Sequence, residues 1–372
     1  MGPIWISGET TKENYASMAR LNIGIIGAGG IARKLHLPQL AQMDDIAVTH
    51  IAGRKPSRLK LLCDQFGISK WTTDYRDILA DDEVDGVIVA LPHPLHVPVG
   101  LDALAAGKHI LMQKPLCGDM DEANAFARAV EAGDRCVLAL PNCGTDVYAA
   151  REIVQSGGIG RVSGAYCRVS HGGPEVYYAE IRDYFAESSA DLWFFQEGEA
   201  SVGALFDMGV YAVTVLVAVM GSVISVMGQT ATLDKPTALD DTATLILKFA
   251  NGAIGTAETG WCDPARSFQL TVHGTKGKIT NPGVHGAGLT RWEPGSYTRE
   301  DVPAIPHEVE LSSYGPKSGS LDAHRQWIEC IHEGRQPELS NVWTARHVTE
   351  ILLAGLESSR TGTRIPVNSQ MT

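Results

Sequence analysis

The chain has 372 residues, of which 44% are hydrophobic and 20% are charged, and its formal net charge is −12. This length favours two domains over one core, and the composition is typical of a soluble globular protein. The acidic charge argues against nucleic-acid binding, which needs a basic surface. The seven cysteines are scattered and never spaced Cys-x-x-Cys, which indicates free thiols in a reducing compartment and no metal site.

The chain carries no recognisable targeting or membrane segment. Residues 1–20 lack the apolar core of a secretory signal and are interpreted as an N-terminal extension. The charge-free stretch 209–228 is long enough to imitate a membrane span. Gly221 divides it, however, into a helical half at 210–220 and a β-branched half at 223–227. We therefore expect a cytoplasmic protein.

From residue 21 to 141, apolar strands alternate with amphipathic helices, and this order predicts a doubly wound parallel sheet. Short apolar runs bounded by turn residues are typical of its buried strands. We expect strands at residues 23–26, 46–52, 84–91, 109–112 and 136–140, and helices at 31–43, 57–66, 94–106 and 120–132.

A glycine-rich turn follows the first strand and opens the first helix. Gly27 allows a tight turn, Gly29 lets the backbone approach a pyrophosphate, and Ala32 allows the helix to pack closely on the strand. The anion would lie on the free N–H groups at the positive end of the helix dipole. The sequence thus predicts a dinucleotide-binding Rossmann domain, with phosphate contacts from Gly27, Ala28, Gly29, Gly30 and Ile31.

The end of the second strand bears on the choice of coenzyme. In NAD-preferring sites an acidic residue at this place accepts a hydrogen bond from the ribose 2′-hydroxyl, and none is present here. Arg54, Lys55 and Arg58 instead form a cationic cluster able to pair with a 2′-phosphate. The same residues would also suit an ordinary solvated helix start. We favour NADP over NAD.

Two further strands end in polar residues at the carboxyl edge of the sheet, where open α/β folds bind ligands. Lys114 directly follows a buried strand, an unusual place for a surface lysine, and is predicted to lie near the nicotinamide ring. His96 could be a core histidine of the helix it opens, but we favour a position facing the coenzyme. The other coenzyme contacts expected from these strand ends are Leu91, Pro92, His93, Gln113 and Pro115.

From residue 142 to 372 the pattern changes and predicts an α+β domain with a large, mostly antiparallel open sheet. The Asn251-Gly252 pair is typical of a hairpin turn. Helices are expected at 147–156 and, with a break at 334–337, over 321–360. Strands are expected at residues 161–169, 223–233, 242–249, 253–259, 268–273 and 277–281.

Four residues of this second domain are candidates for contact with a ligand. Asp207 and Tyr211 stand four apart, so on one helix they would share a face, and there they need polar partners if buried. Backbone groups could supply those partners equally well. His171 and Trp193 accompany further aromatic residues, a combination that suits a pyranose ring or, alternatively, covers a sheet edge.

Together these features resemble the glucose–fructose oxidoreductase/inositol dehydrogenase (Gfo/Idh/MocA) family. The resemblance spans about residues 21–367 and rests on the glycine turn, Lys114-Pro115, Asp207-x-x-x-Tyr211 and the tail segments 327–335 and 358–362. It implies a Rossmann domain, an open-sheet domain often used for oligomer contacts, and NAD(P)-dependent oxidation or reduction of sugars and polyols. Lys114 matches the lysine of the family's Glu-Lys-Pro motif, and Asp207 and Tyr211 match its Asp-x-x-x-His pair.

The chain departs from the family pattern at three places. Gln113 replaces the usual glutamate, so the charge balance around Lys114 differs. Tyr211 stands where many members carry histidine, as in the glucose–fructose oxidoreductase and dimeric dihydrodiol dehydrogenase branch. Asn142 and Cys143 stand where a basic residue is often found, which puts a substrate contact there in doubt.

The resulting hypothesis is hydride transfer between nicotinamide and a carbinol carbon of a small carbohydrate. Tyr211 would act as acid or base with help from Lys114, and Asp207 would hold Lys114 or a substrate hydroxyl. We expect a homo-oligomer, dimer or tetramer, formed through the open sheet. Two alternatives stay open: a redox-neutral glycoside-cleaving enzyme that retains its NAD, and a non-catalytic nucleotide-sensing regulator, which would have no need of these three residues.

Overall fold

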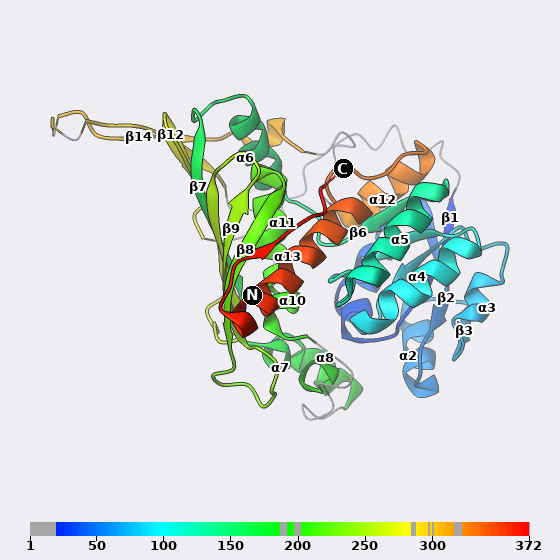
Figure 1. Ribbon diagram of the computed structural model, residues 1–372. Helices are drawn as coiled ribbons and strands as arrows, with labels where there is room; N and C mark the ends of the chain where they lie inside the picture. Colours follow the sequence, from blue (N-terminus) through cyan, green and yellow to red (C-terminus); the bar gives the residue numbers. More distant parts are fainter. Residues whose placement is uncertain are drawn as a thin grey trace.

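The computed structural model describes residues 20–186, 192–196, 202–283, 288–296, 298–299, 301–315 and 322–371. The predicted N-terminal extension lies outside these residues except for Arg20. Figure 1 shows two sheets side by side: a parallel sheet wrapped by helices, at the right, and a second sheet at the left with helices on the face towards the first.

The first sheet is parallel throughout and has the strand order β3-β2-β1-β4-β5-β6. This is the Rossmann order, in which the chain reverses direction across the sheet between β1 and β4. It confirms the predicted doubly wound fold. The elements are β1 (Leu21–Ile26), β2 (Ile46–Ala52), α2 (Pro56–Phe66), β3 (Lys70–Thr72), α3 (Arg76–Leu79), β4 (Gly86–Val89), α4 (His96–Ala105), β5 (His109–Met112), α5 (Met120–Ala132) and β6 (Val137–Ala139).

The helix after the glycine turn contains a widened segment. It runs through η1 (Ala32–His36), where the Leu37 N–H donates to the carbonyl of Ala32 five residues earlier, into α1 (Leu37–Leu40). Pro38 has no N–H to donate, and its ring would crowd the carbonyl of Lys34 in a regular helix. A π-helical turn at this place relieves the crowding, and such turns are frequent at functional sites.

The second sheet has nine strands within the described ranges, in the order β14-β13-β12-β11-β7-β10-β9-β8-β15. All neighbours are antiparallel except β7 and β10. The prediction of a large, mostly antiparallel sheet is therefore confirmed. Its strands are β7 (Val162–Ser170), β8 (Val223–Ala231), β9 (Thr242–Phe249), β10 (Ile254–Gly260), β11 (Ser267–Gly274), β12 (Gly277–Thr280), β13 (Thr290–Glu293), β14 (Ile305–Glu308) and β15 (Ile365–Pro366).

Three helices cover the inner face of this sheet: α6 (Thr145–Gln155), α11 (Gly209–Met220) and α13 (Val342–Thr361). Every residue of α11 except Tyr211 is buried, which explains why residues 209–228 carry no charge: they form a core helix followed by β8. In the part of the chain that the structure describes, no helix is both long and apolar enough to cross a bilayer.

The C-terminal region returns to the first domain. Trp327, Ile328 and Cys330 of α12 (Ala323–His332) pack in the same core as Ile23 and Ile25 of β1. The predicted division, with residues 142–372 in the second domain, does not anticipate this packing. The boundary at residue 141 stays a prediction, and α12 adds core residues to the sheet of the first domain.

Gly27 and Gly29 allow a matched test of the glycine turn. Gly27 has φ +117°, and a Cβ there would lie 2.2 Å from the Ala90 carbonyl oxygen, whereas a Cβ on Gly29 would meet no atom within 4 Å. Gly27→Ala is therefore expected to lower the free energy of unfolding by about 2–4 kcal/mol. Gly29→Ala should change it by less than about 0.5 kcal/mol. Urea unfolding of both variants measures this, and equal stabilities would contradict the steric argument.

Candidate active site

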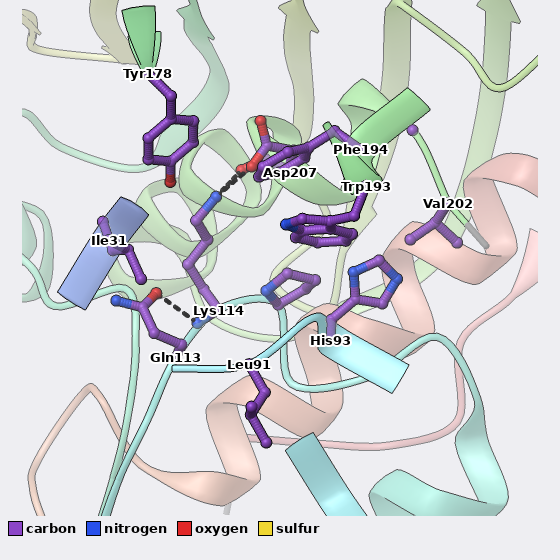
Figure 2. A pocket seen from close by; sticks show the side chains of 12 residues that line it. Ile31, Leu91, His93, Gln113, Lys114, Tyr178, Trp193, Phe194, Val202 and Asp207 are labelled. Carbon is purple, nitrogen blue, oxygen red and sulfur yellow. Dashed lines mark hydrogen bonds and ion pairs between the residues drawn. The ribbon is translucent and has the colours of Figure 1, made fainter. Parts of the chain in front are cut away.

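A buried ion pair joins the two domains. Lys114 follows β5, and its Nζ lies 2.6 Å from both Oδ1 and the backbone carbonyl oxygen of Asp207, the last residue of α10 (Ala204–Asp207). The two side chains are only 14% and 13% exposed. Figure 2 shows the lysine reaching from the first domain to the aspartate across the groove. The predicted pair thus meets although 93 positions separate its members in the chain.

Both members of the pair are charged. Burial favours the neutral amine, but the Asp207 carboxylate raises the pKa of Lys114 above its ordinary value. Burial likewise opposes ionisation of Asp207, yet the Lys114 ammonium lowers the pKa of that carboxyl. Lys114 is therefore a fixed positive charge at the groove and not a free base.

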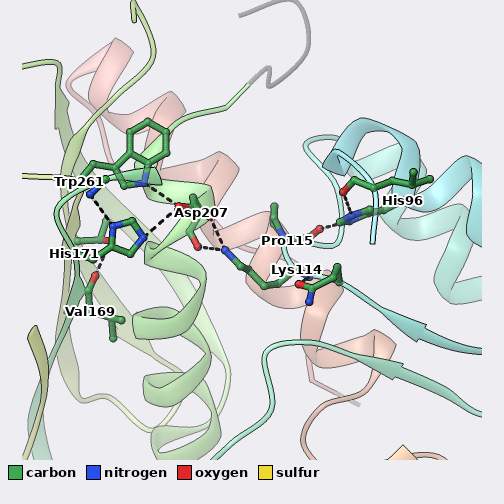
Figure 3. Close-up of polar contacts among 11 residues, drawn as sticks. His96, Lys114, Pro115, Val169, His171, Asp207 and Trp261 are labelled. Atoms are coloured by element: carbon green, nitrogen blue, oxygen red, sulfur yellow. Dashed lines mark hydrogen bonds and ion pairs between the residues drawn. The ribbon is translucent and has the colours of Figure 1, made fainter. Parts of the chain in front are cut away.

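The second carboxylate oxygen of Asp207 is held by the second domain. The Trp261 indole N–H donates to Oδ2 over 2.9 Å, and His171 Nε2 lies 3.9 Å from the same atom (Figure 3). His171 Nδ1 accepts from the Gly173 N–H at 2.8 Å, so a neutral ring carries its proton on Nε2, facing Asp207. Burial lowers the pKa of His171 despite this carboxylate. Sequence reasoning missed Trp261, because one tryptophan after a strand carries no spacing signal.

Tyr211 completes the group, but not on one continuous helix as expected. Asp207 ends α10, Met208 breaks the helical path, and Tyr211 lies in the first turn of α11. The break lets the backbone at Gly209 pack closely on β10, where a Cβ would lie 3.1 Å from Thr259. Lys114 Nζ still lies 5.0 Å from the centre of the Tyr211 ring, so the lysine contacts both residues.

The groove beside this group is lined by six of the fifteen predicted coenzyme contacts: Ile31, Leu91, His93, Gln113, Lys114 and Pro115. Trp193 of η4 (Trp193–Phe195) lies over His93, with ring centres 5.5 Å apart, and Tyr178 lies against Gly30. Tyr178 belongs to the aromatic segment after β7, but the sequence does not indicate which of its rings turn inward. The lining residues are Ile31, Leu91, His93, Gln113, Lys114, Pro115, Tyr178, Trp193, Phe194, Val202, Gly203 and Asp207.

Not every predicted contact lines the groove. His96 is buried, and its ring nitrogens lie 2.8 Å from the carbonyl oxygens of Pro115 and Leu91, so it bridges the loops after β5 and β4. Pro92 stands in the second of these loops but is not among the lining residues. His96 thus orders the two strand ends from behind.

The glycine turn fits a dinucleotide pyrophosphate. The space beside Gly29 is open, and the helix begins there with a hydrogen bond from the Arg33 N–H to the Gly29 carbonyl. Arg58 Nη1 donates to the carbonyl of Ala28, and its guanidinium lies over the ring of Phe185. The other two members of the predicted cationic cluster, Arg54 and Lys55, are exposed at the start of α2. Among the described residues, no group of three His, Cys, Asp or Glu could hold a metal ion.

Fold and site define a class: an oxidoreductase in which a Rossmann domain and an open-sheet domain enclose a dinucleotide groove. Comparison with known proteins gives the family. A model described as oxidoreductase family, NAD-binding Rossmann fold, matches residues 21–139. The model of the GFO/IDH/MocA C-terminal domain matches residues 147–280. Together they cover more than half of the chain, which belongs to the Gfo/Idh/MocA family of NAD-dependent oxidoreductases, as its motifs predict.

The relatives include several sugar dehydrogenases. Levoglucosan dehydrogenase of Pseudarthrobacter phenanthrenivorans is 28% identical over 301 residues, which cover 70% of this chain and 73% of that protein. D-apiose dehydrogenase of Rhizobium rhizogenes is 23% identical over 368 residues, 95% of this chain and 100% of that protein. A structure of levoglucosan dehydrogenase with NADH and L-sorbose matches with a TM-score of 0.76 and 21% identity, over 95% of this chain and 100% of that one. That match shows the shared fold.

Replacing Trp261 by phenylalanine keeps a ring but removes the N–H bound to Asp207. Because that hydrogen bond stabilises the carboxylate, its loss should raise the pKa of Asp207 in the folded protein. A carboxyl group whose pKa is lower in the folded than in the unfolded protein stabilises the fold at a pH above its unfolded pKa. This stabilisation is lost as the pH falls through the pKa of the folded protein. In addition to the loss of packing, Trp261→Phe should therefore lower the free energy of unfolding by about 1.5–3 kcal/mol near pH 7 and by less near pH 3. Urea titrations at the two pH values measure this difference.

Trp327→Phe is the matched control. Trp327 and Trp261 are both fully buried, but Trp327 Nε1 has no hydrogen-bond partner among the described residues. Its replacement should cost packing energy that does not vary with pH. A Trp261→Phe deficit that is equally independent of pH would contradict the role assigned to the indole N–H.

Proposed function

We propose that the protein is an NAD(P)-dependent dehydrogenase or reductase acting on a CH–OH group of a sugar or sugar-like polyol. The observation that carries this proposal is the Lys114–Asp207 ion pair with the Tyr211 ring against it, at the carboxyl edge of a Rossmann sheet. That edge is where a nicotinamide lies in such folds. The relatives named levoglucosan dehydrogenase and D-apiose dehydrogenase support a carbohydrate substrate.

The proposed chemistry assigns one role to each residue. When bound, the nicotinamide accepts or supplies the hydride. Tyr211 takes the proton from the substrate hydroxyl in oxidation and returns it in reduction. The Lys114 ammonium, 5.0 Å from the centre of the Tyr211 ring, would stabilise negative charge that develops on the reacting oxygen atoms during the transfer. Asp207 holds the ammonium in place through two contacts at 2.6 Å, one from its carboxylate and one from its carbonyl oxygen.

The substrate contacts are also proposals. His171 presents an N–H close to Asp207, and a sugar hydroxyl in this position would find both a donor and an acceptor. Trp193 offers a ring face at the groove, which suits the C–H face of a pyranose. Both residues come from the segment after β7, so this segment would determine which sugar binds.

For the coenzyme, we propose phosphate contacts from the glycine turn and a preference for NADP. The open space beside Gly29 supports the first proposal. Arg54 and Lys55, both exposed at the start of α2, support the second, because a 2′-phosphate needs cationic partners. The matched family model is described as NAD-binding, and a structural neighbour of the same fold is in complex with NADH, so the comparisons do not favour NADP over NAD.

We propose further that the protein is a cytoplasmic homo-oligomer. The outer face of the second sheet exposes Ile224, Met227, Ile246 and Ile254, each about half exposed, and Met227 pairs with Ile246 across β8 and β9. An apolar patch on an open sheet is typical of a protein–protein contact, so a dimer or tetramer would form here. All seven cysteines are free thiols, which suits a reducing compartment.

Replacing Tyr211 by phenylalanine tests the proposed function. With NADP or NAD and a panel of aldoses and polyols, the wild-type protein should change the absorbance of reduced nicotinamide. Tyr211→Phe should lower this turnover at least roughly 100-fold and leave the dissociation constant for the coenzyme nearly unchanged. Tyr75→Phe, which removes a distant phenol bound to Asp102, is the control. Near-normal turnover in Tyr211→Phe would remove this residue from the chemistry.

Replacing Arg54 by alanine tests the coenzyme preference. Removing a cationic partner of the 2′-phosphate should weaken NADPH binding about tenfold at low salt and leave NADH binding unchanged, as measured by fluorescence titration. Arg76→Ala provides the control for the change in net charge. Arg76 is exposed at the start of α3 and pairs with Asp74. Equal weakening of both coenzymes would contradict a role in 2′-phosphate recognition.

A further inference from the structure

A buried chain of polar side chains leads from the groove to the surface. Gln113 Nε2 lies 2.9 Å from His36 Nε2, and His36 Nδ1 lies 2.8 Å from His324 Nε2. His324 Nδ1 in turn lies 3.4 Å from Oδ1 of Asp322, the residue that caps α12. His36 and His324 are each 1% exposed. The chain therefore links three elements: the loop after β5, the π-helical segment η1 and the C-terminal helix α12.

The direction of these hydrogen bonds follows from the backbone. The Lys114 N–H can only donate, and it donates to Gln113 Oε1 at 3.1 Å (Figure 2). The amide nitrogen must therefore face His36. His36 Nε2 then accepts, and burial lowers the pKa of His36 well below its ordinary value, which keeps the ring neutral. Its one proton is consequently on Nδ1 and is donated to His324.

The same reasoning continues to the far end of the chain. His324 Nε2 accepts from His36, so a neutral His324 carries its proton on Nδ1, towards the Asp322 carboxylate. Burial opposes ionisation of Asp322, but its contact with His324 lowers the pKa of that carboxyl. The other charged groups at the chain are Arg325, whose backbone N–H donates to Oδ1 of Asp322, and Lys114 beyond Gln113. Every donor therefore points from Gln113 towards Asp322.

We propose that Gln113 is a positioning residue, oriented by two hydrogen bonds of one direction, from Gln113 to His36 and from His36 to His324, whose Nδ1 faces the Asp322 carboxylate at 3.4 Å. Oriented in this way, Gln113 Oε1 holds the backbone N–H of Lys114 and so directs that side chain to Asp207. The role in turnover rests on the proposed dehydrogenase function, whereas the direction of the chain does not.

The chain excludes a carboxylate at position 113 unless one more proton is bound. Each of the two hydrogen bonds needs one hydrogen atom, which Gln113 supplies to the first and His36 to the second, and the contact of His324 Nδ1 with the Asp322 carboxylate needs a third. A glutamate at position 113 supplies none, so two acceptors would face each other somewhere along the chain. Binding of an extra proton by one of the histidines restores all contacts and leaves the net charge unchanged.

The first measurement tests the direction of the chain without an assay of activity. In protein labelled with ¹⁵N-histidine, nitrogen shifts near neutral pH should show His36 and His324 as neutral Nδ1–H tautomers, the form that is rarer in solution. Each signal is assigned by its loss in the corresponding His→Gln variant. An Nε2–H tautomer or a charged ring at either position in the wild-type protein would overturn the proposed chain.

The second measurement tests the positioning role. In Gln113→Glu, kcat/KM relative to wild type should fall at least about tenfold between pH 6 and pH 9, because the extra proton is lost as the pH rises. Gln42→Glu adds the same charge at an exposed site after α1 and should follow the wild-type profile. A loss independent of pH, or no loss, would overturn the positioning role. A wild-type protein inactive on every sugar would instead contradict the proposed function and leave the tautomer result standing.

Discussion

The ion pair between Lys114 and Asp207 is the interaction on which the site depends. Removing two charges from water costs several kcal/mol for each ion, and their attraction offsets this cost only if the remaining hydrogen-bonding groups are also satisfied. Here the carbonyl of Asp207 and the indole of Trp261 supply those partners. Because the lysine follows a strand of one domain and the aspartate ends a helix of the other, the pair also fixes how the domains meet.

The two ends of this pair are positioned by different means. On the Rossmann side, His96 contacts the loops after β4 and β5 from behind the groove, and Gln113, which lines the groove, accepts from the Lys114 backbone N–H. On the other side, the break between α10 and α11 lets Gly209 pack closely on β10, and Asp207 and Tyr211 both contact the lysine. The side chains of Lys114, Asp207 and Tyr211 are thus held by largely buried elements, which limits their freedom.

Elements with a strong periodic pattern could be predicted closely from the sequence. The helix at Met120–Ala132 and the strands at His109–Met112 and Thr242–Phe249 have the predicted bounds. The strands at Lys70–Thr72 and Ile305–Glu308 were missed, because short, mostly exposed strands lack a run of apolar residues. These two segments become strands because their backbones pair with neighbouring strands of the sheet.

The residues of the site also differ in how clearly the sequence indicates them. Lys114, Asp207 and Tyr211 stand in motifs with a definite spacing, so the sequence indicates them, whereas a lone tryptophan such as Trp261 carries no such signal. The contact between His36 and His324 joins residues 288 positions apart, and the division into domains even separated them. Such contacts arise only when α12 packs back on the first sheet.

The packing of α12 on the first sheet gives a physical reason why Gln113 replaces the glutamate of the Glu-Lys-Pro motif. With a glutamate at position 113, a carboxylate would lie at this end of the buried chain, next to the backbone N–H of Lys114. In this protein the carboxylate of the chain is that of Asp322, beyond the His36 and His324 rings, and position 113 is an uncharged amide. Lys114 is thereby left with Asp207 as its ion-pair partner. The amide consequently preserves the one-to-one pairing across the groove that keeps the ammonium directed at Tyr211.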